Sequence, residues 1–107
     1  MIRQEFTGML PAAVNKFEEL LTQVTELHPQ IVQGYNSSAG QDSYFYWGCA
    51  CTIQCDDMVQ LKAEAESLNI TWLSDNGDMA YTNGLDVNDF KTYRVNGNLE
   101  LTPEQEG

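Results

Sequence analysis

Positive charge is scarce in this chain. Its 107 residues include 5 Lys and Arg against 16 Asp and Glu, which gives a formal net charge of −11. Nucleic acids and anionic membrane surfaces are bound through clusters of Lys and Arg. The composition therefore excludes direct binding of nucleic acid and argues against binding to a membrane surface.

Long apolar runs are also missing. No segment approaches the ~18 apolar residues that a membrane-spanning helix needs, and the opening residues 1–10, MIRQEFTGML, lack the apolar stretch of a secretory signal. Cysteines number three, an odd count that suits a reducing compartment better than a disulfide framework. We expect a cytoplasmic protein.

Catalytic motifs are absent from the sequence. There is one histidine, His28, followed directly by Pro29, and nucleophilic triads need a histidine base. No phosphate-binding glycine loop and no HExxH pair occurs. We expect a protein that is not an enzyme and has no cofactor. A carboxylate-based enzyme is an alternative, because 16 acidic residues offer many pairs.

Length and apolar periodicity predict a single α+β domain over residues 1–107, with 102–107 as a loose tail. Apolar residues at helical spacing predict helices over Pro11–His28 and Asp56–Leu68. Alternating or β-rich runs predict strands at Gln30–Tyr35, Ser43–Gln54, Ile70–Ser74, Met79–Thr82, Lys91–Val95 and Asn98–Leu101.

Turn signals indicate how these elements are connected. Asn-Gly pairs at 76–77 and 96–97 predict two hairpins, and Asp86 and Asp89 have the spacing of a capping box. The order α-β-β-α-β-β-β-β predicts a mainly antiparallel sheet with two helices packed on one face.

The cysteines allow two interpretations. Cys49 and Cys51 share one face of a predicted strand, and Cys55 follows shortly after. Thiolates gathered in this way bind metal or carry redox chemistry, so a small metal- or redox-linked protein is an alternative function. A tetrahedral site lacks an evident fourth ligand, and we favour Cys49 and Cys51 as core residues.

The acidic residues are unevenly distributed. Residues 1–55 carry five acids and two bases, whereas residues 56–107 carry eleven acids and three bases. A surface rich in carboxylates, with tyrosine as an anchoring side chain, suits protein recognition. The predicted partner-binding residues are Asp56, Asp57, Glu64, Glu66, Asp75, Asp78, Asp86, Asp89 and Tyr81.

These observations favour a non-catalytic acidic inhibitor or binding protein. Most basic grooves in proteins hold nucleic acid, and an acidic domain that fills such a groove acts as a nucleic-acid mimic. The expected partner is a nuclease or another nucleic-acid-acting protein, as for phage counter-defence and toxin-immunity proteins. A homodimer through an exposed hairpin edge is a further expectation.

Overall fold

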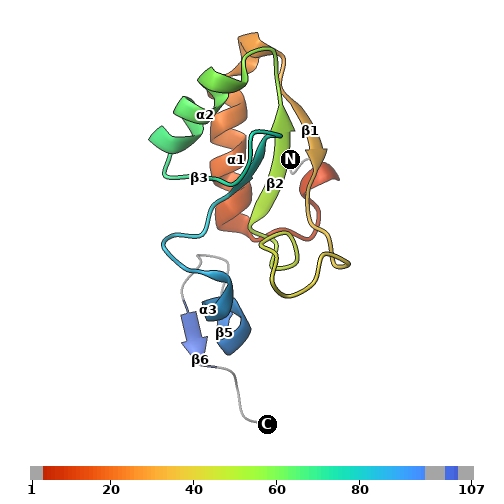
Figure 1. The fold of residues 1–107 in the computed structure, drawn as a ribbon, viewed down its shortest axis with the longest axis vertical. Coiled ribbons are helices and arrows are strands. Elements are labelled where there is room, and N and C mark those ends of the chain that lie inside the picture. The colour runs from red at the N-terminus through yellow and green to blue at the C-terminus, as the bar shows by residue number, and fades with distance from the viewer. Residues whose placement is uncertain (1–3, 96–100, 104–107) are drawn as a thin grey trace.

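The computed structural model describes residues 4–95 and 101–103. Its elements run in the predicted order, with two short 3₁₀ turns and one further helix, and together they confirm the α+β class (Figure 1). The helices are α1 (Pro11–Gln23), α2 (Met58–Ser67) and α3 (Val87–Thr92). The strands are β1 (Gln30–Gln33), β2 (Ala50–Gln54), β3 (Thr71–Trp72), β4 (Asp78–Ala80), β5 (Tyr93–Val95) and β6 (Leu101–Pro103).

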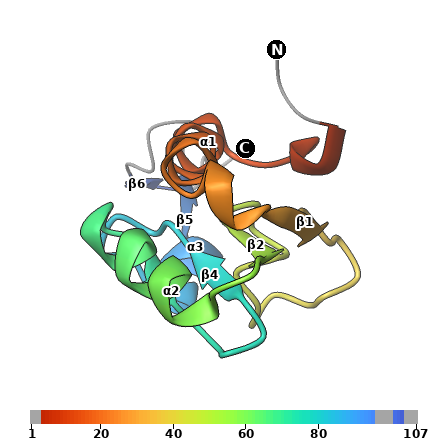
Figure 2. The ribbon, with the colours of Figure 1, turned by 90° about the horizontal axis from the view of Figure 1, so that it is seen from above.

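The first four strands form one antiparallel sheet in the order β1-β2-β4-β3. Strand β2 is interior and pairs Cys51 with Met79 of β4. Helix α2 contacts α1 and the edge strand β3. The view from above shows α2 and β1 toward opposite edges of the sheet (Figure 2). β5 and β6 pair with each other in a separate two-stranded sheet.

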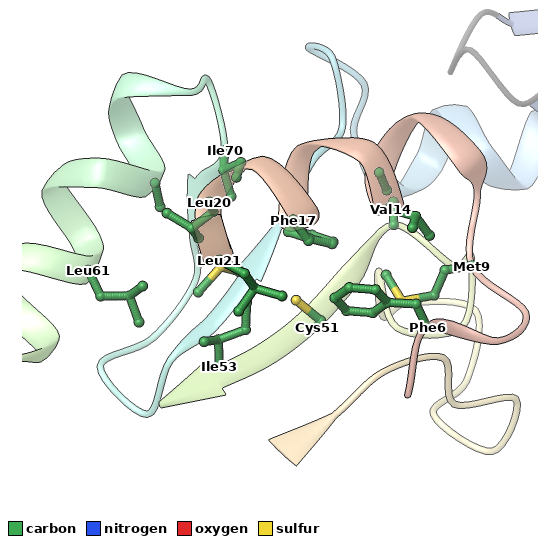
Figure 3. Packing of buried hydrophobic residues seen from close by; sticks show 14 of the residues in the cluster. Phe6, Met9, Val14, Phe17, Leu20, Leu21, Cys51, Ile53, Leu61 and Ile70 are labelled. Carbon is green, nitrogen blue, oxygen red and sulfur yellow. The ribbon is translucent and has the colours of Figure 1, made fainter. Parts of the chain in front are cut away.

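The core lies between α1, α2 and one face of the sheet. Residues on alternate strand positions point to one face, and Cys51 and Ile53 of β2 meet Phe17 and Leu21 of α1 there (Figure 3). Leu61 of α2 completes this side of the cluster. The apolar stripes predicted for both helices are therefore the buried stripes.

Helix α1 ends earlier than predicted. The predicted helix reached His28, but α1 stops at Gln23 and a 3₁₀ turn covers Thr25–Leu27. The Thr25 hydroxyl donates to the carbonyl of Leu21, and His28 takes a left-handed conformation with φ 56°. Pro29 disfavours a helical conformation at the residue before it, so the chain turns at His28 into β1.

The predicted strand Ser43–Gln54 is wrong in its first half. Turns occupy most of residues 43–48, and β2 begins only at Ala50. Gly48 has φ 78°, which strand geometry does not allow. Tyr44 and Trp47 instead pack with Phe90 of α3, at ring-centroid distances of 6.1 and 5.9 Å.

The first predicted hairpin is present between β3 and β4. Ser74 accepts a hydrogen bond from the amide of Gly77, which has φ 97°. A Cβ at this glycine would lie 2.0 Å from the carbonyl oxygen of Ile53. Glycine is thus required both by conformation and by the close approach to β2.

The second hairpin is present as the β5–β6 pair, although its strands are shifted along the chain. Lys91 and Thr92 belong to α3 rather than to the predicted strand. Thr102 and Pro103, assigned to the tail, lie in β6. The Asn96-Gly97 turn and residues 104–107 lie outside the described residues.

Candidate functional site: an acidic helix–hairpin unit

Six of the eight predicted acidic residues fall within residues 56–78, where the only basic residue is Lys62. This segment contains α2, strand β3 and the hairpin turn up to the first residue of β4, and we call it the acidic unit. Asp86 directly precedes α3 and Asp89 lies in its first turn, at the other end of the molecule (Figure 1). The predicted set of acids is therefore divided between two regions.

Asp56 and Asp57 hold the start of α2. Asp57 is the N-cap, and its carboxylate accepts a hydrogen bond of 3.1 Å from the amide of Gln60. The Asp56 Oδ2 lies 2.7 Å from His28 Nδ1. Because side chains with oxygen acceptors satisfy the free amides of a helix start, Asp57 has a structural role in addition to its charge.

Asp75 and Asp78 stabilise the hairpin. Asp75 Oδ1 accepts from the indole Nε1 of Trp72 at 3.2 Å. Asp78 accepts from the hydroxyls of Thr52 on β2 and Ser74 in the turn. Asp78 is half-buried with two hydroxyl donors, so it is held within the sheet, whereas Asp75 is exposed.

Glu64 and Glu66 do not face the same way. Residues two apart on an α-helix point to different sides, and Glu66 is exposed while Glu64 is half-buried. With buried Leu61 and Ala65 between the two flanks, Glu66 shares its flank with Val59 and Glu64 does not. A partner surface laid on the flank of Val59 and Glu66 would contact Glu66 but not Glu64, so Glu64 is not part of the contact surface that we consider below.

The capping box predicted on α3 is confirmed. The amide of Asp86 donates to the Asp89 carboxylate at 2.9 Å, and the amide of Asp89 donates to Asp86 at 3.0 Å. Lys91 of the same helix pairs with Asp42. This pairing ties α3 to the loop that follows β1.

Tyr81 directly follows strand β4 and lies against α1. It is half-buried, its amide donates to the carbonyl of Cys49, and the ammonium of Lys16 on α1 is 5.8 Å from its ring centre. Its position beside α1 suits a contact within the fold.

A groove between α2 and the hairpin was not predicted. It measures about 360 Å³ and is lined by Met58, Val59, Lys62, Trp72 and Asp75. Among the residues whose side chains the structure describes, Val59 is the most exposed large hydrophobic residue, at 82%. Its position outside the buried stripe of α2 was the sequence signal for this groove.

The three cysteines differ in how deeply they are buried. Cys49 and Cys51 are fully buried in the core, which confirms their interpretation as core residues. Loss of hydration raises the pKa of Cys49 to about 12 and also raises the pKa of Cys51. Cys55 is half-buried, and its thiol donates to the carbonyl of Asp57. Within residues 4–95 and 101–103, no three Cys, His, Asp or Glu residues gather as metal ligands.

Three hollows in the described part of the chain each have a single carboxylate in their lining. One of them, of about 580 Å³, lies between α1 and β1, and both Glu5 and His28 line it. The others contain Asp75 and Asp56. Paired carboxylates for acid–base chemistry are thus not found together in any of these three.

Over the described part of the chain, none of the helices is both long and apolar enough to cross a membrane. Comparison with protein-family models, with curated proteins and with solved structures found no match to this chain.

Proposed function

We propose that this chain is a non-catalytic binding protein that places its acidic unit against a basic, nucleic-acid-binding site of a partner protein and so blocks that site. The observation that carries the proposal is the concentration of acids on α2 and the adjoining hairpin, where Asp56, Asp57, Glu66, Asp75 and Asp78 stand against one lysine and Glu64 lies on the other flank of α2. Such a surface attracts basic proteins and repels nucleic acid itself.

The rigidity of the acidic unit supports this role. Asp57 and Asp75 each accept a hydrogen bond from a neighbouring residue of the same unit. Each carboxylate keeps further acceptor positions, so the acidic groups are held in place before a partner arrives. Preorganised charge lowers the entropy that binding costs.

Size, charge and proposed mode of action suit the phage counter-defence and toxin-immunity classes. Three free cysteines suit the reducing cytoplasm, where we place the protein. The partner class is a nuclease or another protein that handles nucleic acid.

The proposal is tested by capture from a lysate of the organism that carries the gene. Immobilised wild-type chain is compared with Asp56→Lys/Glu66→Lys/Asp75→Lys and with the control Glu5→Lys/Glu19→Lys/Glu64→Lys. Each reversal adds two charge units, so both triple variants carry −5 instead of −11. We expect a basic protein that the wild type and the control retain, that the first variant loses, and that DNA displaces. Equal retention by all three chains contradicts the proposal.

A further inference from the structure

The groove of the acidic unit has two chemically different walls. Met58, Val59 and Lys62 come from the first turns of α2, and Trp72 and Asp75 come from the hairpin. The helix wall is mainly apolar with a cation at its end, whereas the hairpin wall is aromatic and anionic. A ligand that fills the groove must match both.

The two residues of the hairpin wall, Trp72 and Asp75, are joined by a hydrogen bond. The Trp72 indole donates to Asp75 Oδ1 at 3.2 Å, which fixes the ring and the carboxylate relative to each other. A guanidinium stacks on an aromatic face and pairs with a carboxylate through its planar fork. Since a carboxylate has about four acceptor positions, Asp75 accepts from both the indole and an incoming arginine.

Charge selects the orientation of the occupant. Asp75 stands on the hairpin side and Lys62 on the helix side, so a cation is attracted to the first and repelled by the second. The helix side offers the exposed Val59 and the half-buried Met58. An apolar side chain next to the arginine therefore belongs there.

We propose that this groove binds an arginine side chain of the partner protein, stacked on Trp72 and paired with Asp75, with a neighbouring apolar side chain on Met58 and Val59. This inference rests on the proposed function and names the contact through which the acidic unit recognises its partner. Aromatic and arginine contacts of this kind are the ones that dominate protein interfaces.

The test uses N-acetyl-leucyl-arginine amide as the probe and the indole N–H resonance of Trp72 in a ¹⁵N–¹H NMR spectrum as the readout. We expect a saturable shift of the Trp72 indole and of the Met58–Lys62 amides, while the Trp47 indole stays unchanged. The citrulline analogue keeps the shape and loses the charge, so we expect at least about ten-fold weaker binding. Equal shifts with both peptides, or no shift at Trp72, overturn the inference.

Two matched variants localise the contact. Asp75→Asn removes one charge but leaves an oxygen that accepts from the indole, and we expect at least a five-fold loss of peptide affinity. Glu64→Gln removes the same charge from the other flank of α2, and we expect an unchanged affinity. Equal losses in both variants would mean that only the general negative field binds the peptide.

The outcomes separate this inference from the proposed function. If the triple reversal abolishes partner capture but the arginine peptide leaves Trp72 unaffected, the groove inference is wrong, whereas the proposal that the acidic unit binds the partner is retained. If the peptide binds at Trp72 but the triple reversal and its control retain the same proteins, the groove is real and the proposed function is wrong.

Discussion

At the residue scale, several acids of this protein both carry negative charge and hold the local backbone through hydrogen bonds. Asp57 caps α2, and Asp86 and Asp89 cap each other at the start of α3. The capping box was predictable because its partners are three residues apart. The bond between Asp78 and Thr52 was not, since it joins residues on two strands whose pairing depends on the whole sheet.

Replacing Asp57 tests its role as a cap. Asp57→Ala removes the acceptor for the Gln60 amide, and we expect the free energy of unfolding to fall by about 1 kcal/mol. Asp57→Asn keeps a capping oxygen, so its loss is expected to be only a few tenths of a kcal/mol. Urea unfolding of both variants gives the values. Equal losses would show that the charge, and not the cap, matters at this position.

Burial of the thiols predicts their reactivity. In the native protein we expect a thiol reagent at pH 8 to modify Cys55 and to leave Cys49 and Cys51 unmodified, because both are fully buried and have raised pKa values. In denaturant all three are expected to react. Rapid modification of more than one thiol without denaturant would contradict this burial.

The same burial predicts how stability depends on pH. The pKa of Cys49 is raised from 9.0 to about 12, so the unfolded chain loses this proton first as pH rises. The stability that the folded state gains by keeping the Cys49 thiol protonated is complete below pH 9 and is lost as the pH rises from 9 to about 12. We expect unfolding free energies measured from pH 8 to 10.5 to fall less steeply in Cys49→Ala. An equal slope in both proteins would contradict the assignment.

At the element scale, the sequence predicted elements better than their ends. The helix stripes and the β3–β4 hairpin follow from local spacing and turn chemistry, and both are present. The segment 43–48 alternates as a strand does, yet it forms turns. The rings of Tyr44 and Trp47 pack on Phe90, a contact between distant residues that no local pattern reveals.

Phe90 joins α3 to the rest of the molecule. It is 2% exposed and its ring stacks on Trp47 with centroids 5.9 Å apart. We expect Phe90→Ala to lower the free energy of unfolding by about 3 kcal/mol and to change the fluorescence of Trp47. Phe90→Leu keeps most of the volume and is expected to lose less. If both variants unfold as the wild type does, α3 is not held through this ring.

At the scale of the whole molecule, the negative charge is best understood by its location. Composition alone argued against negatively charged partners. The count along the chain placed most of the excess of acidic over basic residues after residue 55. The structure adds that six of these acids lie on or next to α2 and the hairpin, beside the groove, while two others lie at the start of α3 at the opposite end. The groove depends on the packing of α2 against β3, which residue spacing does not specify.

The most direct measurement is the affinity of the captured partner for the wild type, for Asp56→Lys/Glu66→Lys/Asp75→Lys and for Glu5→Lys/Glu19→Lys/Glu64→Lys at about 50 and 300 mM salt, since screening over about 10 Å at 0.1 M weakens charge attraction. We predict that the wild type and the control bind at low salt and weaken at least about ten-fold at high salt, and that the first variant does not bind. An affinity that is independent of salt, or an equal loss in both variants, would contradict recognition by the acidic unit.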